Sequence, residues 1–162
     1  MKPFLTFARW LHHLTLGLAF LALFLCLCGQ AMVVLLRYGF SFGFPWLSDM
    51  ASWSFAAFVM LAIPVALAAD GHVRIDIFRE RQTGRQRIMT DYWATCLLLV
   101  PLACVIVETT WPQAVAAYAG SETSLQAGGL PGHWAIRLLP AIAFILAVVQ
   151  AVARFAASRN DE

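Results

Sequence analysis

The sequence predicts an all-α membrane protein with four transmembrane helices and both termini in the cytoplasm. Of its 162 residues, 61% are hydrophobic and only 12% are charged, whereas about a quarter of the residues of a soluble domain are charged. The mean hydropathy is +0.74, and four long apolar stretches alternate with polar or turn-rich segments. A core this small cannot bury such an apolar excess, so lipid must solvate it.

The first predicted helix covers residues 14–36, a run without a charged side chain. It is about 23 residues or roughly 34 Å long, enough to cross a bilayer with some tilt. A short basic head precedes it, as in a secretory signal, but the apolar run of a signal has only about 7–15 residues. We therefore expect this helix to be retained.

Aromatic residues alternate with small or turn-forming residues directly after Arg37. They are Tyr38, Phe40, Phe42, Phe44 and Trp46. Such alternation suits a strand, but the interspersed Gly39, Gly43 and Pro45 argue against one. Aromatic side chains at a membrane boundary usually form an interfacial belt. The run is therefore interpreted as a belt, with a partner-binding surface as the alternative.

The second predicted helix covers residues 47–69. Ser48 is suited to cap its N-terminus, and Asp49 is placed in the first turn, where the helix dipole favours a carboxylate. The third covers residues 92–118 and is expected to bend near Pro101 or Pro112. A glycine-rich loop follows, and the fourth helix covers residues 134–155.

Two charges are placed near the outer membrane boundary, Glu108 on the third helix and Arg137 on the fourth. An isolated charge at that depth is costly, so we predict that these residues form an ion pair between the helices. The alternative is that each side chain extends separately to the lipid headgroups.

The basic residues predict the orientation. Five arginines fall between Arg74 and Arg87, in the polar segment between the second and third helices. Nine of the eleven basic residues fall on the side that holds this segment and both termini, and only Arg37 and Arg137 fall on the other. Short basic loops stay in the cytoplasm, so both termini are expected there. Residues 1–162 are expected to form one domain.

The sequence predicts no catalytic residue, no cofactor and no metal site. The four cysteines lie inside apolar runs and form no Cys-x-x-Cys pair, so they are interpreted as small packing residues. The histidines lie at or outside the predicted membrane ends, which argues against haem. His72 and Asp76 are interpreted as polar residues that anchor a loop, with direct ligand binding as the alternative. Nucleic acid is not an expected partner, because no basic groove with interleaved aromatic residues is evident.

An independent carrier of a polar solute usually keeps ionisable groups deep in the membrane. The first two predicted helices contain none at mid-depth, and the two charges of the later helices are expected near the boundary. The pattern therefore favours a scaffold or accessory subunit over an independent carrier.

Several motifs resemble the small membrane subunit (DctQ type) of TRAP transporters. They are Arg37-Tyr38, Trp46, Asp49, and a membrane helix that closes on Gly71-His72-Val73-Arg74-Ile75-Asp76. The later Leu130-Pro131, Trp134 and Pro140 are similar to that family's approach to its last helix. The residues singled out as interface or structural candidates are Arg37, Tyr38, Trp46, Asp49, Gly71, His72, Arg74, Asp76, Glu108, Pro131, Trp134 and Arg137.

The resemblance implies a non-enzymatic subunit of a sodium-coupled tripartite transporter in the bacterial inner membrane, importing an organic acid. Its implied partners are a large membrane subunit (DctM type), a periplasmic substrate-binding protein and membrane lipids. Two alternatives come from other classes: a four-helix membrane thiol oxidoreductase, and a self-sufficient small membrane exporter. The first needs reactive cysteines in the outer loops and the second a carboxylate in the first helix, and the sequence has neither.

Overall fold

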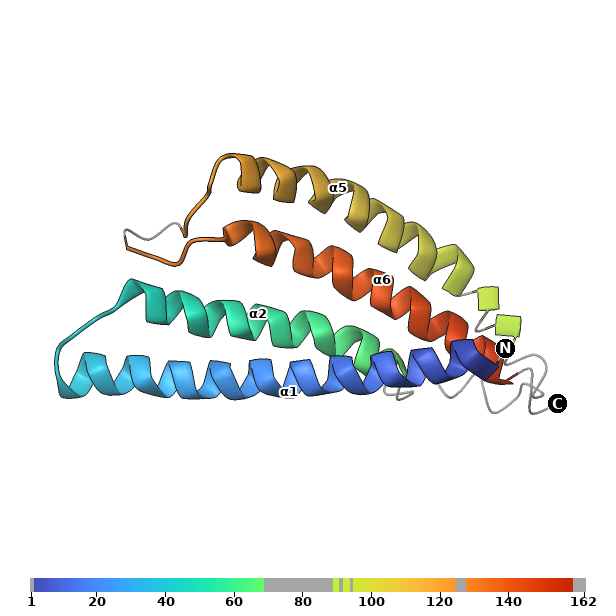
Figure 1. Cartoon of the computed structure of the whole chain (residues 1–162), viewed down its shortest axis with the longest axis horizontal. Helices are drawn as coiled ribbons and strands as arrows, with labels where there is room; N and C mark the ends of the chain where they lie inside the picture. Colours follow the sequence, from blue (N-terminus) through green and yellow to red (C-terminus); the bar gives the residue numbers. More distant parts are fainter. Residues whose placement is uncertain (1, 69–88, 91, 94, 125–127, 159–162) are drawn as a thin grey trace.

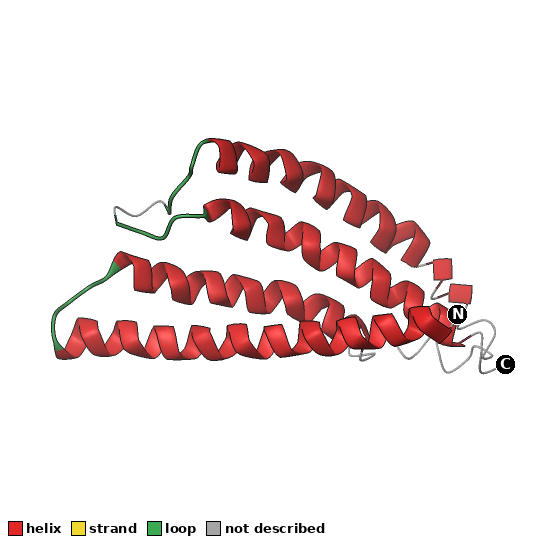
Figure 2. Cartoon of the chain, viewed as in Figure 1, coloured by secondary structure: helices red, strands yellow, loops and turns green. Residues whose placement is uncertain are grey.

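Four helices long and apolar enough to cross a membrane make up most of the chain in the computed structural model (Figure 1). The structure describes residues 2–68, 89–90, 92–93, 95–124 and 128–158. Helices α1 (Lys2–Gly39) and α2 (Pro45–Ala68) are followed by a short π-helix, η1 (Thr95–Leu99), and by α5 (Val100–Ala119) and α6 (His133–Ser158). Figure 2 shows helices joined by loops, with no strand in the described residues. The predicted all-α fold with four membrane-length helices is confirmed.

The helices form two antiparallel hairpins, α1 with α2 and α5 with α6. Helix α6 contacts both α5 and α2, so the bundle is joined through α6, and α5 lies at its edge (Figure 1). In keeping with this, 28% of the residues in the most apolar part of α6 are buried, whereas only 6% are buried in the most apolar part of the stretch that holds η1 and α5. The start of α1 and the end of α6 lie at the same end of the bundle, as an even number of crossings requires.

Small residues dominate the contacts between the helices. The buried hydrophobic residues, apart from Leu47, are the alanines at positions 8, 19, 22, 51, 103, 114, 117, 141, 143, 147, 151 and 153. In a membrane, lipid covers large apolar side chains as well as protein does, so helices associate where small residues let their backbones approach closely. Many large apolar side chains are accordingly exposed on all four helices.

The helix boundaries differ most from expectation at the N-terminus. Helix α1 begins at Lys2, twelve residues before the predicted Leu14. Hydropathy marks the part of a helix that lipid can cover, but the basic head continues the same helix beyond that part. At 38 residues, α1 is roughly 57 Å long, well beyond the thickness of a bilayer.

Helix α2 begins at Pro45, because proline suits the first helical position, where its missing N–H costs nothing. The prediction of Ser48 as the N-cap is therefore wrong, and Asp49 lies beyond the first turn. The predicted third helix is present as η1 and α5, and the fourth extends from His133 to Ser158. The predicted residues Gly71, His72, Arg74 and Asp76 lie outside the described residues.

Candidate functional site

The end of the bundle that carries the α1–α2 turn and the α5–α6 loop brings together several of the residues singled out in the sequence (Figure 1). We call the group there the loop-end cluster. Its members come from α2, α5, α6 and the α5–α6 loop: Asp49, Trp53, Tyr118, Glu122, Leu130, Pro131, His133, Trp134 and Arg137.

Asp49 joins α2 to the α5–α6 loop. Its side chain is buried, with 7% of the residue exposed, and its Oδ2 accepts a hydrogen bond of 3.1 Å from the backbone N–H of Leu130. The loop approaches so closely that a Cβ atom on the neighbouring Gly129 would collide with Asp49 Oδ2 and with the Ser124 side chain. The role expected for Asp49 was to complement the helix dipole; its contact is instead with a loop 81 residues further along the chain.

The α5–α6 loop is held in shape by its own backbone. Thr123 and Pro131 form an isolated antiparallel bridge, and the N–H of Ser124 donates to the carbonyl of Leu130 at 3.0 Å. The N–H of His133 donates to the carbonyl of Glu122 at 3.4 Å, next to the first turn of α6. The loop therefore presents Leu130 to Asp49 and Glu122 to α6.

Glu122 is the ion-pair partner of Arg137. Arg137 Nη2 lies 2.7 Å from Glu122 Oε2, and His133 Nδ1 lies 3.9 Å from the same oxygen. The predicted pair between Glu108 and Arg137 is wrong, because Glu108 lies 11 residues before the end of α5 while Arg137 is in the fifth position of α6. In the observed pair, the side chains of Arg137 and Glu122 are 33% and 40% exposed. Solvent therefore screens their charges, and the ion pair stabilises the fold by at most about 1 kcal/mol.

Two ring contacts connect the helices of this cluster. Trp53 of α2 stacks on His133 of α6 at a centroid distance of 5.9 Å, and Tyr118 of α5 meets the edge of Trp134 of α6 at 5.7 Å. Trp134 is among the residues singled out in the sequence, whereas Trp53, Tyr118, Glu122 and His133 are not. Tyr118, Glu122 and His133 have position as their only sequence signal, since each lies at a helix end or in a loop. Trp53, the ninth residue of α2, has no such signal.

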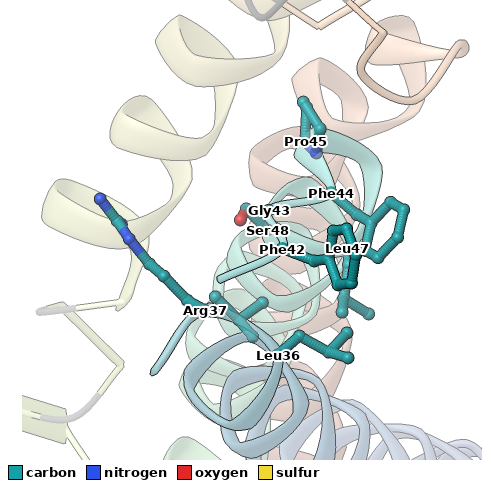
Figure 3. A pocket seen from close by; sticks show the side chains of 9 residues that line it. Leu36, Arg37, Phe42, Gly43, Phe44, Pro45, Leu47 and Ser48 are labelled. Atoms are coloured by element: carbon teal, nitrogen blue, oxygen red, sulfur yellow. The ribbon is translucent and has the colours of Figure 1, made fainter. Parts of the chain in front are cut away.

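The remaining candidates at this end lie on the α1–α2 turn. Arg37 occupies the last turn of α1, where a cation suits the dipole, and Tyr38 is 81% exposed. An open hollow of about 230 Å³ is lined in part by Arg37, Phe42 and Phe44, but the Arg37 side chain extends away from these two rings (Figure 3). Trp46 is 45% exposed and contacts Phe44. The described contacts do not join these residues to Asp49 or Arg137.

The described residues contain no group of three or more His, Cys, Asp or Glu side chains placed to hold a metal ion. All four cysteines are free thiols within the helices, and Cys28, Cys96 and Cys104 are exposed on the outer surface of the bundle. The contacts of the loop-end cluster join α2, α5, α6 and the α5–α6 loop to one another.

A comparison with protein-family models matches residues 26–160 to the family described as tripartite ATP-independent periplasmic transporters, DctQ component. The match covers most of the chain: the end of α1 from residue 26 onward and all of α2, η1, α5 and α6. It therefore includes every member of the loop-end cluster. No curated protein and no solved structure matches the chain significantly.

Proposed function

Because the chain belongs to the DctQ family of tripartite ATP-independent periplasmic transporters, we propose that it is the small, non-catalytic membrane subunit of a sodium-coupled importer of an organic acid. Its proposed partners are a large DctM-type membrane subunit, which holds the solute and sodium sites, and a periplasmic binding protein, which delivers the solute. The chain supports the large subunit and helps to dock the binding protein.

One observation carries the proposal that this chain is a scaffold and not a carrier. The buried polar side chains of the described residues are Thr15, Asp49 and Gln150, and all three are engaged by backbone groups. Thr15 Oγ1 donates to the Leu11 carbonyl at 2.8 Å, Gln150 Nε2 donates to the Ala8 carbonyl at 3.2 Å, and Asp49 accepts from Leu130. A charged solute needs polar groups to replace its lost hydration. Here Gln150 and Asp49 bond to other parts of the bundle, and Thr15 bonds within its own helix.

Reconstitution tests this proposal directly. The chain alone, the large subunit alone and the two together are placed in separate liposomes with binding protein, solute and an inward sodium gradient. Uptake is expected only with both membrane subunits, because the large subunit holds the solute and sodium sites and this chain supports the large subunit. Uptake by this chain alone would favour the self-sufficient carrier, and full uptake by the large subunit alone would contradict a required supporting role.

We also propose that the chain lies in the bacterial inner membrane with the loop-end cluster at the periplasmic face and both termini in the cytoplasm. The basic segment between Arg74 and Arg87 supports this orientation. In a background without native cysteines, Ser41→Cys on the exposed α1–α2 turn should react with an impermeant thiol reagent in intact cells. Gln82→Cys, in the basic segment, should react only after the membrane is permeabilised. The reverse labelling pattern would invert the orientation.

A further inference from the structure

Glu108 is an exposed carboxylate in the middle of a membrane-length helix. The apolar stretch that contains it runs from Thr95 to Ala119, so Glu108 lies 13 residues after its start and 11 before its end. At about 1.5 Å per residue, Glu108 is roughly 16 to 20 Å from either end of this stretch. Glu108 therefore lies near the middle of the stretch that is long and apolar enough to cross a membrane, and a glutamate side chain is too short to reach either end of it.

Glu108 points away from its own bundle. Helix α5 packs on α6, and its buried residues are Ala103, Ala114 and Ala117. With 3.6 residues per turn, Glu108 lies about 150° around the helix from these alanines. It shares the outward stripe, which we call the Glu108 face, with exposed residues one and two turns away: Pro101, Val105, Pro112 and Val115.

The side chains of Glu108, Thr109 and Thr110 are polar and adjacent on α5, but only the two threonines have hydrogen-bond partners within the chain. The hydroxyl of Thr109 donates to the Val105 carbonyl at 2.8 Å, and that of Thr110 donates to the Ile106 carbonyl at 2.6 Å. Among the described residues, the Glu108 carboxylate has no ion pair or hydrogen bond. Pro112 also lacks the N–H that would normally bond to the Glu108 backbone carbonyl. The Glu108 side chain is thus an acceptor for which the described residues supply no donor.

Hydrocarbon offers no hydrogen-bond donor, so an unpaired carboxyl group at this depth costs several kcal/mol by general scales. A second copy of the chain is a poor alternative partner, because its described arginines lie toward helix ends, at Arg9, Arg37, Arg137 and Arg154. A symmetric pair would instead bring two Glu108 side chains together. This face is instead complementary to a helix of a different protein that carries a hydrogen-bond donor at the same depth.

We propose that the Glu108 face is covered by a transmembrane helix of the large subunit, and that a basic or hydrogen-bond-donating side chain of that helix binds the Glu108 carboxyl group. This rests on the proposed function and adds to it the face of the chain that binds. The position of α5 at the edge of the bundle leaves that face open to a partner (Figure 1). The side chains of Pro101, Val105 and Pro112 on this face are short and exposed, which lets a neighbouring helix approach closely.

The test compares three variants of the full chain, co-expressed with the large subunit and purified by an affinity tag after detergent extraction. Glu108→Leu should reduce the retained large subunit about tenfold or more, which corresponds to about 1.4 kcal/mol. Glu108→Gln should retain an intermediate amount, because an amide still accepts a hydrogen bond. Thr109→Val is the matched control and should retain as much as the wild type, since the Thr109 hydroxyl is satisfied within its own helix.

Two further measurements separate binding from folding. The isolated Glu108→Leu chain should unfold at the same temperature as the wild type or higher, because leucine suits a lipid-exposed position. A photo-reactive amino acid placed at Val105 or Val115 should crosslink to the large subunit in native membranes. Undiminished retention by Glu108→Leu, or crosslinks only to lipid or to a second copy, would overturn the assignment of this face. If even the wild-type chain retains no large subunit, the proposed function itself fails.

Discussion

Replacing Gly129 with alanine should release the α5–α6 loop from α2 and lower the free energy of unfolding by about 1–3 kcal/mol, the usual cost of adding a methyl group where there is no room. The added Cβ would collide with the Asp49 carboxylate and lie 2.5 Å from Ser124 Cβ. Neither neighbour moves freely, because Asp49 is buried on α2 and Ser124 is held by the Leu130 carbonyl. The loop must therefore shift, and the hydrogen bond between Leu130 and Asp49 is lost with it.

Denaturant titration in detergent measures this loss, and hydrogen exchange of the Leu130 amide reports the loop directly. Exchange should accelerate in Gly129→Ala. Gly43→Ala is the matched control, because it also adds a methyl group in a loop at this end of the bundle but has no neighbour within 4 Å. Equal stability and equal exchange in the two variants would contradict the close contact.

The Asp49 side chain provides an independent check on the same contact. Asp49→Asn should have a small effect, since the amide oxygen can still accept from Leu130. Asp49→Ala should accelerate exchange at Leu130 as strongly as Gly129→Ala does, because it leaves that N–H without its acceptor. Together these variants separate the loss of an acceptor from a steric clash.

The membrane-crossing segments could be predicted from the sequence because hydropathy depends on each residue and its near neighbours. Turn residues likewise identified the loops, and α2 begins at Pro45, only two residues before the predicted start of the second helix. The extension of α1 to Lys2 could not be read in this way. A helix continues through polar residues as long as no helix-breaking residue interrupts it. The basic head contains no proline or glycine after Pro3 in its first turn.

The contacts of the candidate site were harder to predict because they join residues that are distant in sequence. Arg137 was correctly expected to need an acidic partner, but Glu122 was overlooked because it lies in a glycine-rich loop whose path the sequence does not reveal. Asp49 and Leu130 meet for the same reason. For Glu108, the sequence showed a charge between two apolar runs, and only the continuation of the helix through Ala119 placed it near the middle of a membrane-length stretch.

The second large effect is expected where α1 and α2 approach most closely. A Cβ atom on Gly29 would lie 3.3 Å from Ala51 Cβ and 3.4 Å from Met50 Cε, and Ala51 is only 1% exposed. Gly29→Leu should therefore push the two helices apart and cost about 1–3 kcal/mol of stability, the usual range for overpacking. The same change at Gly17, which has no neighbour within 4 Å, should cost nothing. It should even stabilise α1 by up to about 1 kcal/mol, since leucine is the better helix former.

Comparing the two leucine variants by thermal unfolding in detergent removes the contribution of helix propensity, because both changes gain it equally. The remaining difference reports how closely α1 and α2 pack. A second pair of variants locates the contact: Ala51→Gly should restore part of the stability lost in Gly29→Ala, since it returns the space that the new methyl group needs. If Gly29→Leu and Gly17→Leu unfold at the same temperature, the helices do not depend on this approach. Lipid, unlike water, does not drive apolar helices together, so a closely packed small-residue contact of this kind is what must hold the first hairpin closed.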